Sequence, residues 1–216
     1  MASTLLLAGV GERIGESVAR RFHAAGWNVA CVARSGDVTD PLADELDRVL
    51  AVRADLTDED AVGRAVEETR AAFGPVDCLV CNASAGGGNP IDEADPATFE
   101  RLWRVRALGS FLLVRACLDD LRPEGTVLFS GTTYATDPAP EQVEWGSAAP
   151  AVRGLAETLD VALDGVHVAY VRIAAAVRPP DSEFEGAVGA DAVAKRYLEL
   201  AESSDAVVSD PRIGPP

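Results

Sequence analysis

The stretch Thr4–Gly15, TLLLAGVGERIG, decides the fold of the chain. It joins a short apolar run, typical of a buried strand, to a helical pattern of apolar residues that Gly26 brings to an end. The turn between them holds Gly9, Gly11 and Gly15. Glycines at such a turn let the backbone bend sharply and approach a pyrophosphate, which binds to the free N–H groups at the start of a helix. The stretch therefore predicts a dinucleotide site at the first turn of the fold.

Strand-like and helical stretches alternate along the remainder of the chain, without repeats or a linker. Strands are expected at residues 3–9, 28–33, 50–56, 76–84, 125–131, 166–173 and 206–209, with helices between them. Each strand is nearly all apolar, which is typical of a parallel sheet covered by helices on both faces. The pattern predicts a single domain over residues 1–216 with an α/β, doubly wound, Rossmann-type fold and a parallel seven-stranded sheet. Such a fold binds its ligand at the carboxyl ends of the strands.

Three helix starts are expected from the residues placed there. Thr57 is positioned to cap the helix after the third strand, and Asp95 with Pro96 to begin the long fourth helix. The next long helix contains Pro150. Proline is tolerated in the first helical turn, whose N–H groups have no helical partner, but costs around 3 kcal/mol in a helix interior. We therefore expect this helix to begin near Ser147, with Ser147 as its cap, or to be kinked there.

Acidic residues outnumber basic ones by 35 to 19, which gives a net charge of −16, and Lys195 is the only lysine. Such a surface repels the phosphates of nucleic acids, so we expect no nucleic-acid partner. No apolar run approaches the roughly 20 residues of a membrane span, and the first strand lacks the flanks of a signal peptide. These features favour a cytoplasmic protein that acts on a small-molecule substrate and is not attached to a membrane. The excess of acid over lysine fits either a salt-rich cytoplasm or a GC-rich genome.

The four cysteines are expected to be ordinary buried thiols. Cys78 and Cys81 form a C-x-x-C pair, but they lie inside a predicted strand. Residues three apart on a strand point to opposite faces, so the pair cannot readily hold one metal ion or form a disulfide. Together with Cys31 and Cys117 they indicate a reducing compartment, and no metal site is expected.

The residues at the end of the second strand indicate which nucleotide binds. An NAD-binding chain usually places an acid there for the ribose hydroxyls, whereas this strand ends with Arg34 and Ser35. Arg13, which with Ile14 completes the predicted cofactor-binding turn, is a second cation nearby. A guanidinium makes paired hydrogen bonds to a phosphate, which favours the 2′-phosphate of NADP over NAD. The alternative is that both arginines are solvated surface residues.

Five motifs follow one another along the chain: GVGERIG, ADLTDEDAV, VCNASAG, RVRALGSFLLVRA and GTVLFSGTT. Their order and spacing resemble the short-chain dehydrogenase/reductase family over essentially the whole chain. The resemblance implies a nicotinamide dinucleotide cofactor, with Asp55 and Leu56 at the adenine and Asn82 and Ala83 at the adenosine ribose. It also implies a homodimer or homotetramer formed through the fourth and fifth crossover helices.

The chain departs from the family pattern where the family keeps its catalytic groups. The resemblance aligns Arg13 with a glycine of the first turn, Arg106 with an asparagine that holds a proton-relay water, and Thr132 with the catalytic serine. It aligns Trp145 and Ala149 with the tyrosine and lysine of the Tyr-x-x-x-Lys motif. None of the three tyrosines is followed by lysine four residues later. The chain is thus predicted to be an atypical member that lacks this motif.

A substitute for the family's tyrosine must exchange a proton at the substrate oxygen while hydride moves to or from the adjacent carbon. An indole N–H has no accessible acid dissociation, so Trp145 cannot replace the phenol directly. Thr132 and Tyr134 are candidates near the expected nicotinamide end, and Arg106 is a candidate for orienting a carboxylate or stabilising an oxyanion. A carboxylate whose pKa is raised by the apolar tryptophan is a further candidate: Asp137, Glu141 or Glu144.

Three functions remain open from the sequence. The first is an NADP(H)-dependent oxidoreductase that acts on a small carbonyl or alcohol substrate with a non-standard proton donor. The second is a non-redox enzyme on the same scaffold, such as a cyclase, dehydratase or isomerase. The third is a catalytically inactive cofactor-binding protein or partner subunit.

The stretch after the sixth strand, residues 173–189, is short and lacks Pro-Gly, which predicts a reduced substrate lid.

Overall fold

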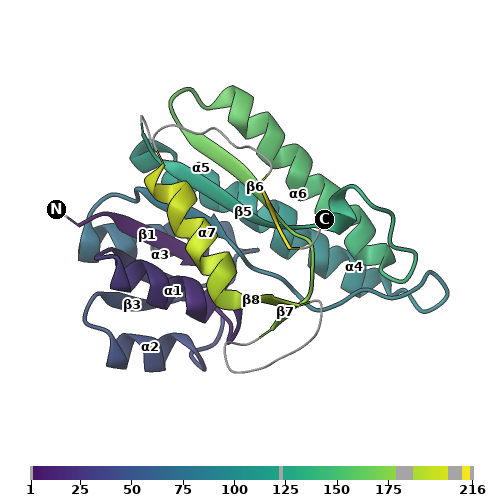
Figure 1. Cartoon of the computed structure of the whole chain (residues 1–216), viewed down its shortest axis with the longest axis horizontal. Helices are drawn as coiled ribbons and strands as arrows, with labels where there is room; N and C mark the ends of the chain where they lie inside the picture. The colour runs from purple at the N-terminus through teal and green to yellow at the C-terminus, as the bar shows by residue number, and fades with distance from the viewer. Residues whose placement is uncertain (1, 122–123, 179–186, 204–210, 215–216) are drawn as a thin grey trace.

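The computed structural model describes residues 2–121, 124–178, 187–203 and 211–214. Seven strands form one parallel sheet in the order β3-β2-β1-β4-β5-β6-β9 (Figure 1). Because the order reverses after β3, a topological switch point lies between β1 and β4. The doubly wound fold is confirmed. The bounds of the sheet strands are β1 Thr4–Ala8, β2 Asn28–Ala33, β3 Val49–Arg53, β4 Cys78–Cys81, β5 Thr126–Thr132, β6 His167–Ile173 and β9 Arg212–Ile213.

Helices cover both faces of the sheet (Figure 1). On one face α1 (Ile14–Ala24) and α7 (Ala190–Glu202) lie side by side, with α2 (Thr39–Glu45) near the β3 edge. On the other face lie α3 (Glu59–Phe73), α5 (Gly109–Leu121) and α6 (Val143–Ala162). The other helical elements of the described residues are α4 (Pro96–Trp103), the π-helical turn η1 (Arg104–Leu108) and the 3-10 turn η2 (Thr133–Ala135).

Six of the seven predicted strands correspond to β1 through β6. The seventh, expected at residues 206–209, lies outside the described residues, and β9 occupies the last position in the sheet. The predicted lid also lies partly outside them, because residues 179–186 are not described. In the described parts of the predicted lid, residues 173–189, β7 (Val177–Arg178) and β8 (Val188–Gly189) form a separate parallel pair.

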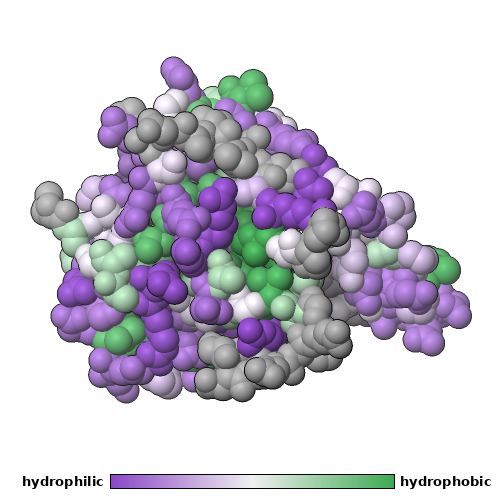
Figure 2. All heavy atoms as spheres, in the orientation of Figure 1, coloured by the Kyte–Doolittle hydropathy of each residue, from purple (hydrophilic) through white to green (hydrophobic). Residues whose placement is uncertain are grey.

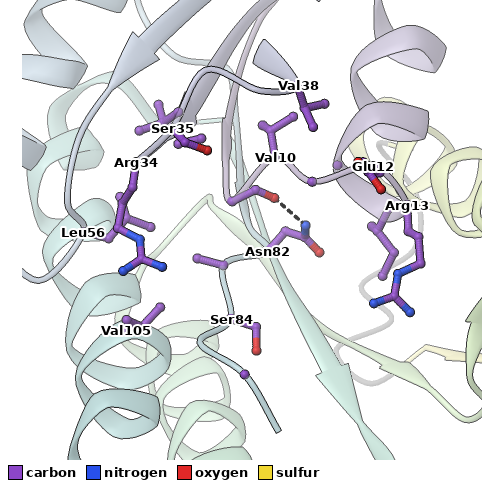
Figure 3. Close-up of a pocket in the computed structure, with 18 of the residues that line it drawn as sticks. Val10, Glu12, Arg13, Arg34, Ser35, Val38, Leu56, Asn82, Ser84 and Val105 are labelled. Atoms are coloured by element: carbon purple, nitrogen blue, oxygen red, sulfur yellow. Dashed lines mark hydrogen bonds between the residues drawn. The ribbon is translucent and has the colours of Figure 1, made fainter.

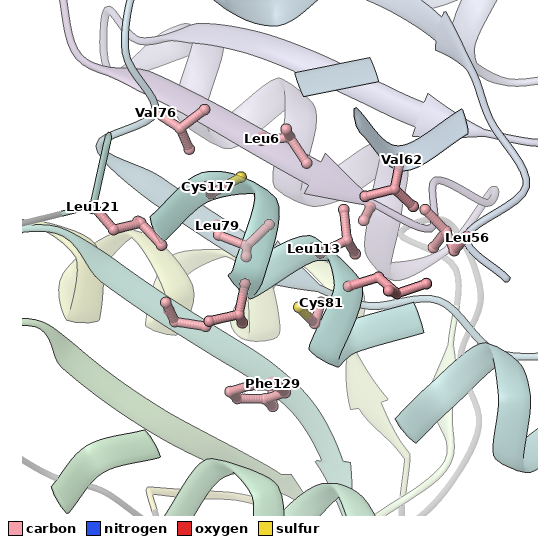
Figure 4. Close-up of a cluster of buried hydrophobic side chains, with 14 of the residues drawn as sticks. Leu6, Leu56, Val62, Val76, Leu79, Cys81, Leu113, Cys117, Leu121 and Phe129 are labelled. Atoms are coloured by element: carbon pink, nitrogen blue, oxygen red, sulfur yellow. The ribbon is translucent and has the colours of Figure 1, made fainter. Parts of the chain in front are cut away.

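Alternate residues of each strand face opposite helix layers. Leu6 of β1 belongs to the cluster beneath α3, α5 and α6, whereas Leu5 faces α1 and α7. Figure 4 shows Leu6 and Cys81 in the first cluster, and Cys78 lies in the second. The two cysteines therefore point to opposite faces as predicted, and all four cysteines are free and buried.

An aspartate caps the start of both α3 and α4. Asp58 caps α3, because its carboxylate accepts a backbone N–H of the first turn. The expectation that Thr57 does so was wrong, since the Thr57 N–H and hydroxyl both donate to the Asp55 carboxylate. Asp95 caps α4, followed by Pro96, as predicted. A local hydrogen bond within the preceding turn thus decided between two adjacent capping residues.

Helix α6 begins at Val143, so the prediction of a start near Ser147 was wrong. The Val143 N–H donates to the Asn89 carbonyl at 2.9 Å, and the Gln142 side chain accepts the Gly88 N–H at 2.9 Å. These contacts with a distant loop supply polar partners at the start of the helix. Consequently the helix extends past the expected cap and carries its proline in the interior.

Helices α4 and α5 are joined by η1, so that residues 96–121 run as one continuous helix. Short π-helical segments inside helices are frequent at functional sites. Polar and charged residues cover much of the face seen in Figure 2, with a group of hydrophobic residues near its middle and others at its edges. In the part of the chain that the structure describes, no helix is both long enough and apolar enough to cross a bilayer.

Gly131 in β5 tests how tightly the sheet packs. A Cβ at Gly131 would lie 2.3 Å from the ring of Tyr170, which is 1% exposed. We expect Gly131→Ala to lower the free energy of unfolding by about 1–3 kcal/mol, because the buried ring has no space to move into. Gly154→Ala in α6, where an added Cβ meets nothing, should raise it by about 0.5–1 kcal/mol. Urea unfolding measures both changes, and equal midpoints would contradict the close packing.

Candidate active site

A cavity of about 1330 Å³ opens at the carboxyl ends of β1, β2, β3 and β4. This volume exceeds the roughly 300–1,000 Å³ of a typical small-molecule site. Tyr134 and Trp145 line it, whereas Thr132 and Arg106 do not. The residues predicted to bind the cofactor all line it: Gly9, Gly11, Arg13, Ile14, Gly15, Arg34, Ser35, Asp55, Leu56, Asn82 and Ala83. The fold therefore gathers one continuous site from segments far apart in the sequence.

The glycine turn has no room for side chains where it packs against the sheet. Gly9 has a φ of 95°, and a Cβ there would lie 2.3 Å from the backbone nitrogen of Ala83. A Cβ at Gly15 would lie 2.6 Å from the Cα of Val10. Gly11, in contrast, lines the cavity and has nothing within 4 Å of an added Cβ. The turn thus leaves an open cradle at the start of α1, where free N–H groups favour a phosphate.

A chain of hydrogen bonds holds this turn from behind. The Asn82 Nδ2 donates to the Gly9 carbonyl at 2.6 Å (Figure 3), and the Asn82 Oδ1 accepts from the Ser130 Oγ at 2.8 Å. Because the Ser130 hydroxyl has only one proton, the Tyr197 hydroxyl at 2.7 Å is the donor to it. Tyr197 is fully buried in α7, and burial raises the pKa of its hydroxyl. No sequence motif predicts this partner, which comes 67 residues after Ser130.

Arg34 and Ser35 follow β2 and lie together on one side of the glycine turn (Figure 3). Asp55 lines the same cavity, and hydrogen bonds from Thr57 lower the pKa of its carboxyl, with a smaller effect from Arg34. Asp37 lines the cavity as well. The sequence pattern did not single out this acid, although it stands three residues after Arg34.

Arg13 lies on the opposite side of the turn, next to Glu12 (Figure 3). Its guanidinium donates to the Val177 carbonyl of β7 at 3.4 Å. The structure does not bring together the two arginines that were expected to meet one phosphate. They are separated because Arg13 stands at the start of α1, whereas Arg34 follows β2.

Tyr134 and Trp145 form the cavity wall beyond the end of β5, with their rings edge to face and 6.3 Å between centroids. The Trp145 indole N–H donates to the Gly86 carbonyl at 3.1 Å, so the protein itself already uses it. No described residue forms a hydrogen bond with the Tyr134 hydroxyl. Thr132 ends β5, and its backbone N–H and carbonyl both bind the Tyr170 hydroxyl.

Arg106 lies behind this wall, on the π-helical turn η1. It is 5% exposed, and its Nη2 donates to the Ser130 carbonyl at 3.0 Å. Its guanidinium carbon is 4.2 Å from the centre of the Trp145 ring, while its Nε has no hydrogen-bond partner among the described residues. Burial lowers the pKa of Arg106 to about 10, so the side chain stays protonated at neutral pH.

Glu144 is a structural carboxylate, and the hypothesis that its pKa is raised was wrong. The side chain is fully buried, but its carboxylate accepts the backbone N–H of Asn89 at 2.7 Å and that of Asp95 at 3.3 Å. These hydrogen bonds, the Asn89 N–H above all, lower the pKa of Glu144. Its oxygen atoms hold the loop after β4 to the start of α6. Partners 49 to 55 residues away make this role invisible in the sequence.

The lowered pKa of Glu144 makes a prediction about stability. Its ordinary value is 4.5, so the carboxylate stabilises the folded state fully above that pH, and this contribution is lost as the pH falls through the lower folded-state value. We expect Glu144→Gln to lower the melting temperature at pH 7, with a difference from the native protein that shrinks below pH 4.5. Exposed Glu141→Gln is the control. Thermal unfolding between pH 7 and pH 3 measures both, and a constant difference would contradict the assignment.

The sequence matches the profile of a protein family described as short chain dehydrogenase over residues 3–179. A short chain dehydrogenase of Pseudocercospora fijiensis is 29% identical over 199 residues, a match that covers 88% of this chain and 63% of that protein. The chain therefore spans less than two thirds of the length of that relative.

Two solved structures resemble the whole fold. An alcohol dehydrogenase from the archaeon Thermococcus sibiricus, complexed with 5-hydroxy-NADP, has a TM-score of 0.91 at 24% identity, covering 99% of this chain and 97% of that chain. A 3-ketoacyl-(acyl-carrier-protein) reductase from Brucella melitensis, complexed with NADH, has a TM-score of 0.88 at 26% identity, covering 98% and 96%. Because the alcohol dehydrogenase is only 24% identical to this chain, its likeness concerns the fold alone.

Proposed function

We propose that this chain, which belongs to the short-chain dehydrogenase/reductase family, transfers hydride between NADP(H) and a small carbonyl or alcohol substrate. The observation that carries the proposal is that every residue predicted to hold the cofactor lines one cavity at the switch point. Fluorescence titration with NADPH and NADH, followed by NADPH oxidation across a panel of small carbonyl compounds, tests it. Binding of neither nucleotide at millimolar concentration would refute it. Binding without turnover would favour the inactive cofactor-binding protein.

The residues of the cavity fit a dinucleotide. The open cradle at Gly11 would be filled by any side chain, and the adjacent helix start suits a pyrophosphate. We assign Asp55 and Leu56 to the adenine and Asn82 and Ala83 to its ribose, since all four residues line the cavity. The remaining end, between Tyr134 and β7, is left for the nicotinamide, which supplies or accepts the hydride when bound.

Arg34 supports NADP over NAD. It is exposed at the carboxyl end of β2, beside Ser35, on the side of the cavity assigned to the adenosine. A guanidinium and a hydroxyl suit the 2′-phosphate of NADP, because both donate hydrogen bonds to its oxygens. Arg13 lies on the opposite side of the turn and contacts β7, so we assign it to the pyrophosphate and the nicotinamide end.

Separate substitutions distinguish the two arginines. We expect Arg34→Gln to raise the Kd for NADPH about tenfold and to leave the Kd for NADH unchanged, because only NADPH has the phosphate to lose a charge-assisted contact. Arg13→Gln should raise the Kd for NADPH and the Kd for NADH by the same factor, since both nucleotides contain the pyrophosphate. Fluorescence titration gives all four constants. Equal losses for both nucleotides in Arg34→Gln would contradict the assigned role.

Tyr134 is the best-placed group to exchange the proton with the substrate oxygen. Tyr134 lines the cavity, and its hydroxyl has no protein partner among the described residues. The rival groups are engaged or displaced: Trp145 donates to Gly86, Glu144 holds a loop, and Thr132 lies off the cavity lining. Proton exchange by a positioned hydroxyl typically contributes about 10²–10⁴-fold to the rate.

A second hollow of about 480 Å³ adjoins the cofactor cavity at Tyr134. Its lining contains no charged side chain: Tyr134, Ala135, Thr136, Pro138, Ala139, Pro140, Gly146 and Pro150. An apolar hollow of this kind suits a small uncharged group. We place there the part of the substrate that lies beyond the reacting carbonyl.

Tyr134→Phe removes the proposed proton donor without changing the ring. Once a carbonyl substrate is found, we expect this variant to lower kcat at least about 100-fold, with the Kd for NADPH unchanged. Thr132→Val should lower kcat less than about fivefold, because that side chain does not line the cavity. Steady-state NADPH oxidation measures both. A greater loss in Thr132→Val than in Tyr134→Phe would show that the proton comes from the threonine.

We further propose a cytoplasmic homodimer or homotetramer. Large hydrophobic side chains are exposed on the helix that includes α4 and α5: Phe99 at 41%, Trp103 at 44% and Phe111 at 43%. Burying such side chains against a second copy is favourable, as in many homodimers. The four buried free thiols suit a reducing compartment. Sedimentation as a monomer at high micromolar concentration would refute the assembly.

A further inference from the structure

Arg106 and Glu144 are the only charged side chains that are buried among the described residues. The carboxylate of Glu144 is satisfied by backbone and side-chain N–H groups. Arg106 makes one hydrogen bond, its Nε makes none, and no described carboxylate forms an ion pair with it. A buried charge without a counter-charge destabilises the fold, because the lost hydration is not replaced. A cation retained under these conditions therefore indicates a function beyond packing.

The position of Arg106 relative to the cavity suggests that function. Its guanidinium lies 4.2 Å from the centre of the Trp145 ring, and Trp145 lines the cavity together with Tyr134. Arg34 and Asp55 follow β2 and β3, which lie on one side of β1 in the sheet, whereas Tyr134 follows β5 on the other side, and the glycine turn follows β1 between them. If the proposed function is correct, the nicotinamide therefore lies at the end where Arg106 stands behind the wall.

The nicotinamide ring carries one positive charge when oxidised and none when reduced. A fixed cation within several ångströms disfavours the oxidised ring, and the repulsion is strong where protein excludes water. We propose that Arg106 makes the site select the oxidation state of its cofactor, so that NADPH binds more tightly than NADP⁺. This inference rests on the proposed function and adds to it a residue that sets cofactor specificity.

The groups around Arg106 do not cancel its charge. Its nearest titratable neighbours, Tyr170 and Tyr197, are neutral at physiological pH. The carboxylate of Glu144 is turned toward the loop after β4. Other acids of the chain are mostly on the surface, where solvent and salt screen them. The guanidinium is shielded from water by the Trp145 ring and by its own burial.

Direct binding measurements test the inference without any turnover. Titration calorimetry with NADPH and with NADP⁺ gives two dissociation constants and their ratio. For the native protein we expect the Kd for NADP⁺ to exceed that for NADPH by about tenfold or more, as repulsion between two unit charges in a partly desolvated site implies. Arg106→Met, which removes the charge and keeps much of the side-chain volume, should lower this ratio about tenfold.

Two control variants separate charge from structure. Arg106→Lys keeps the charge and loses the planar stacking on Trp145, so it should retain most of the native ratio. Arg101→Met removes a cation from the exposed surface of α4 and should leave the ratio unchanged, because a solvated charge is screened. If Arg106→Met does not fold, Arg106→Gln serves as the neutral variant, and folding of each is checked by circular dichroism.

The outcomes are distinguishable. A native protein that binds both forms of the cofactor equally, or a neutral variant that keeps the native ratio, would overturn the inference and leave the proposed function intact. Failure to bind either form would overturn the proposed function and the inference together. A ratio that falls in the neutral variant and persists in Arg106→Lys would establish the electrostatic role.

Discussion

The close approach of the backbone at Gly9 to the backbone at Ala83 is the constraint on which the site depends. An added Cβ at Gly9 would lie 2.3 Å from the Ala83 nitrogen, and the φ of 95° is one that other residues rarely adopt. This contact joins the turns after β1 and β4 at the point where the strand order reverses. Only then can Asn82 donate to the Gly9 carbonyl and the cavity lie across both turns. Packing by itself therefore requires glycine at position 9, in addition to any requirement that a ligand imposes.

Ser130 connects the two halves of the site. Its hydroxyl donates to Asn82, which holds the glycine turn, and accepts from Tyr197 in the last helix. Its carbonyl accepts from Arg106, whose guanidinium lies against Trp145. The glycine turn and the Trp145 side of the cavity are therefore connected through one residue of β5.

The first turn of α6 is held by an ordered set of contacts. Trp145 and Ala149 stand where the family's tyrosine and lysine align, yet the space is filled by an ordered set of contacts. The indole binds Gly86 and covers a buried cation, and Glu144 holds the neighbouring loop through backbone N–H groups. Since Trp145 and Glu144 already make these contacts, only groups without a protein partner remain candidates for proton exchange. The same set of contacts leaves the Arg106 guanidinium 4.2 Å from the centre of the Trp145 ring.

The prediction of the fold from sequence succeeded because strands and the glycine turn are local patterns. Apolar runs, their spacing and Gly9, Gly11 and Gly15 determine the doubly wound sheet and the place of the cavity. The cap of α4 was also predicted, since Asp95 needs only the N–H groups of the next turn. The residues that line the cavity on the cofactor side follow from these patterns, because parallel strands place all their carboxyl ends at one edge.

Contacts between distant segments decided the rest. The start of α6, the lowered pKa of Glu144 and the bond between Ser130 and Tyr197 all involve partners about 50 or more residues apart. The separation of Arg13 from Arg34 depends on the directions in which two turns leave the sheet. The sequence by itself determined the alternation of strands and helices, the glycine turn and the absence of any tyrosine followed by lysine four residues later, because each is a local pattern along the chain. Only the tertiary structure decided which polar side chains remain free, because hydrogen-bond partners and burial are set by packing across the fold.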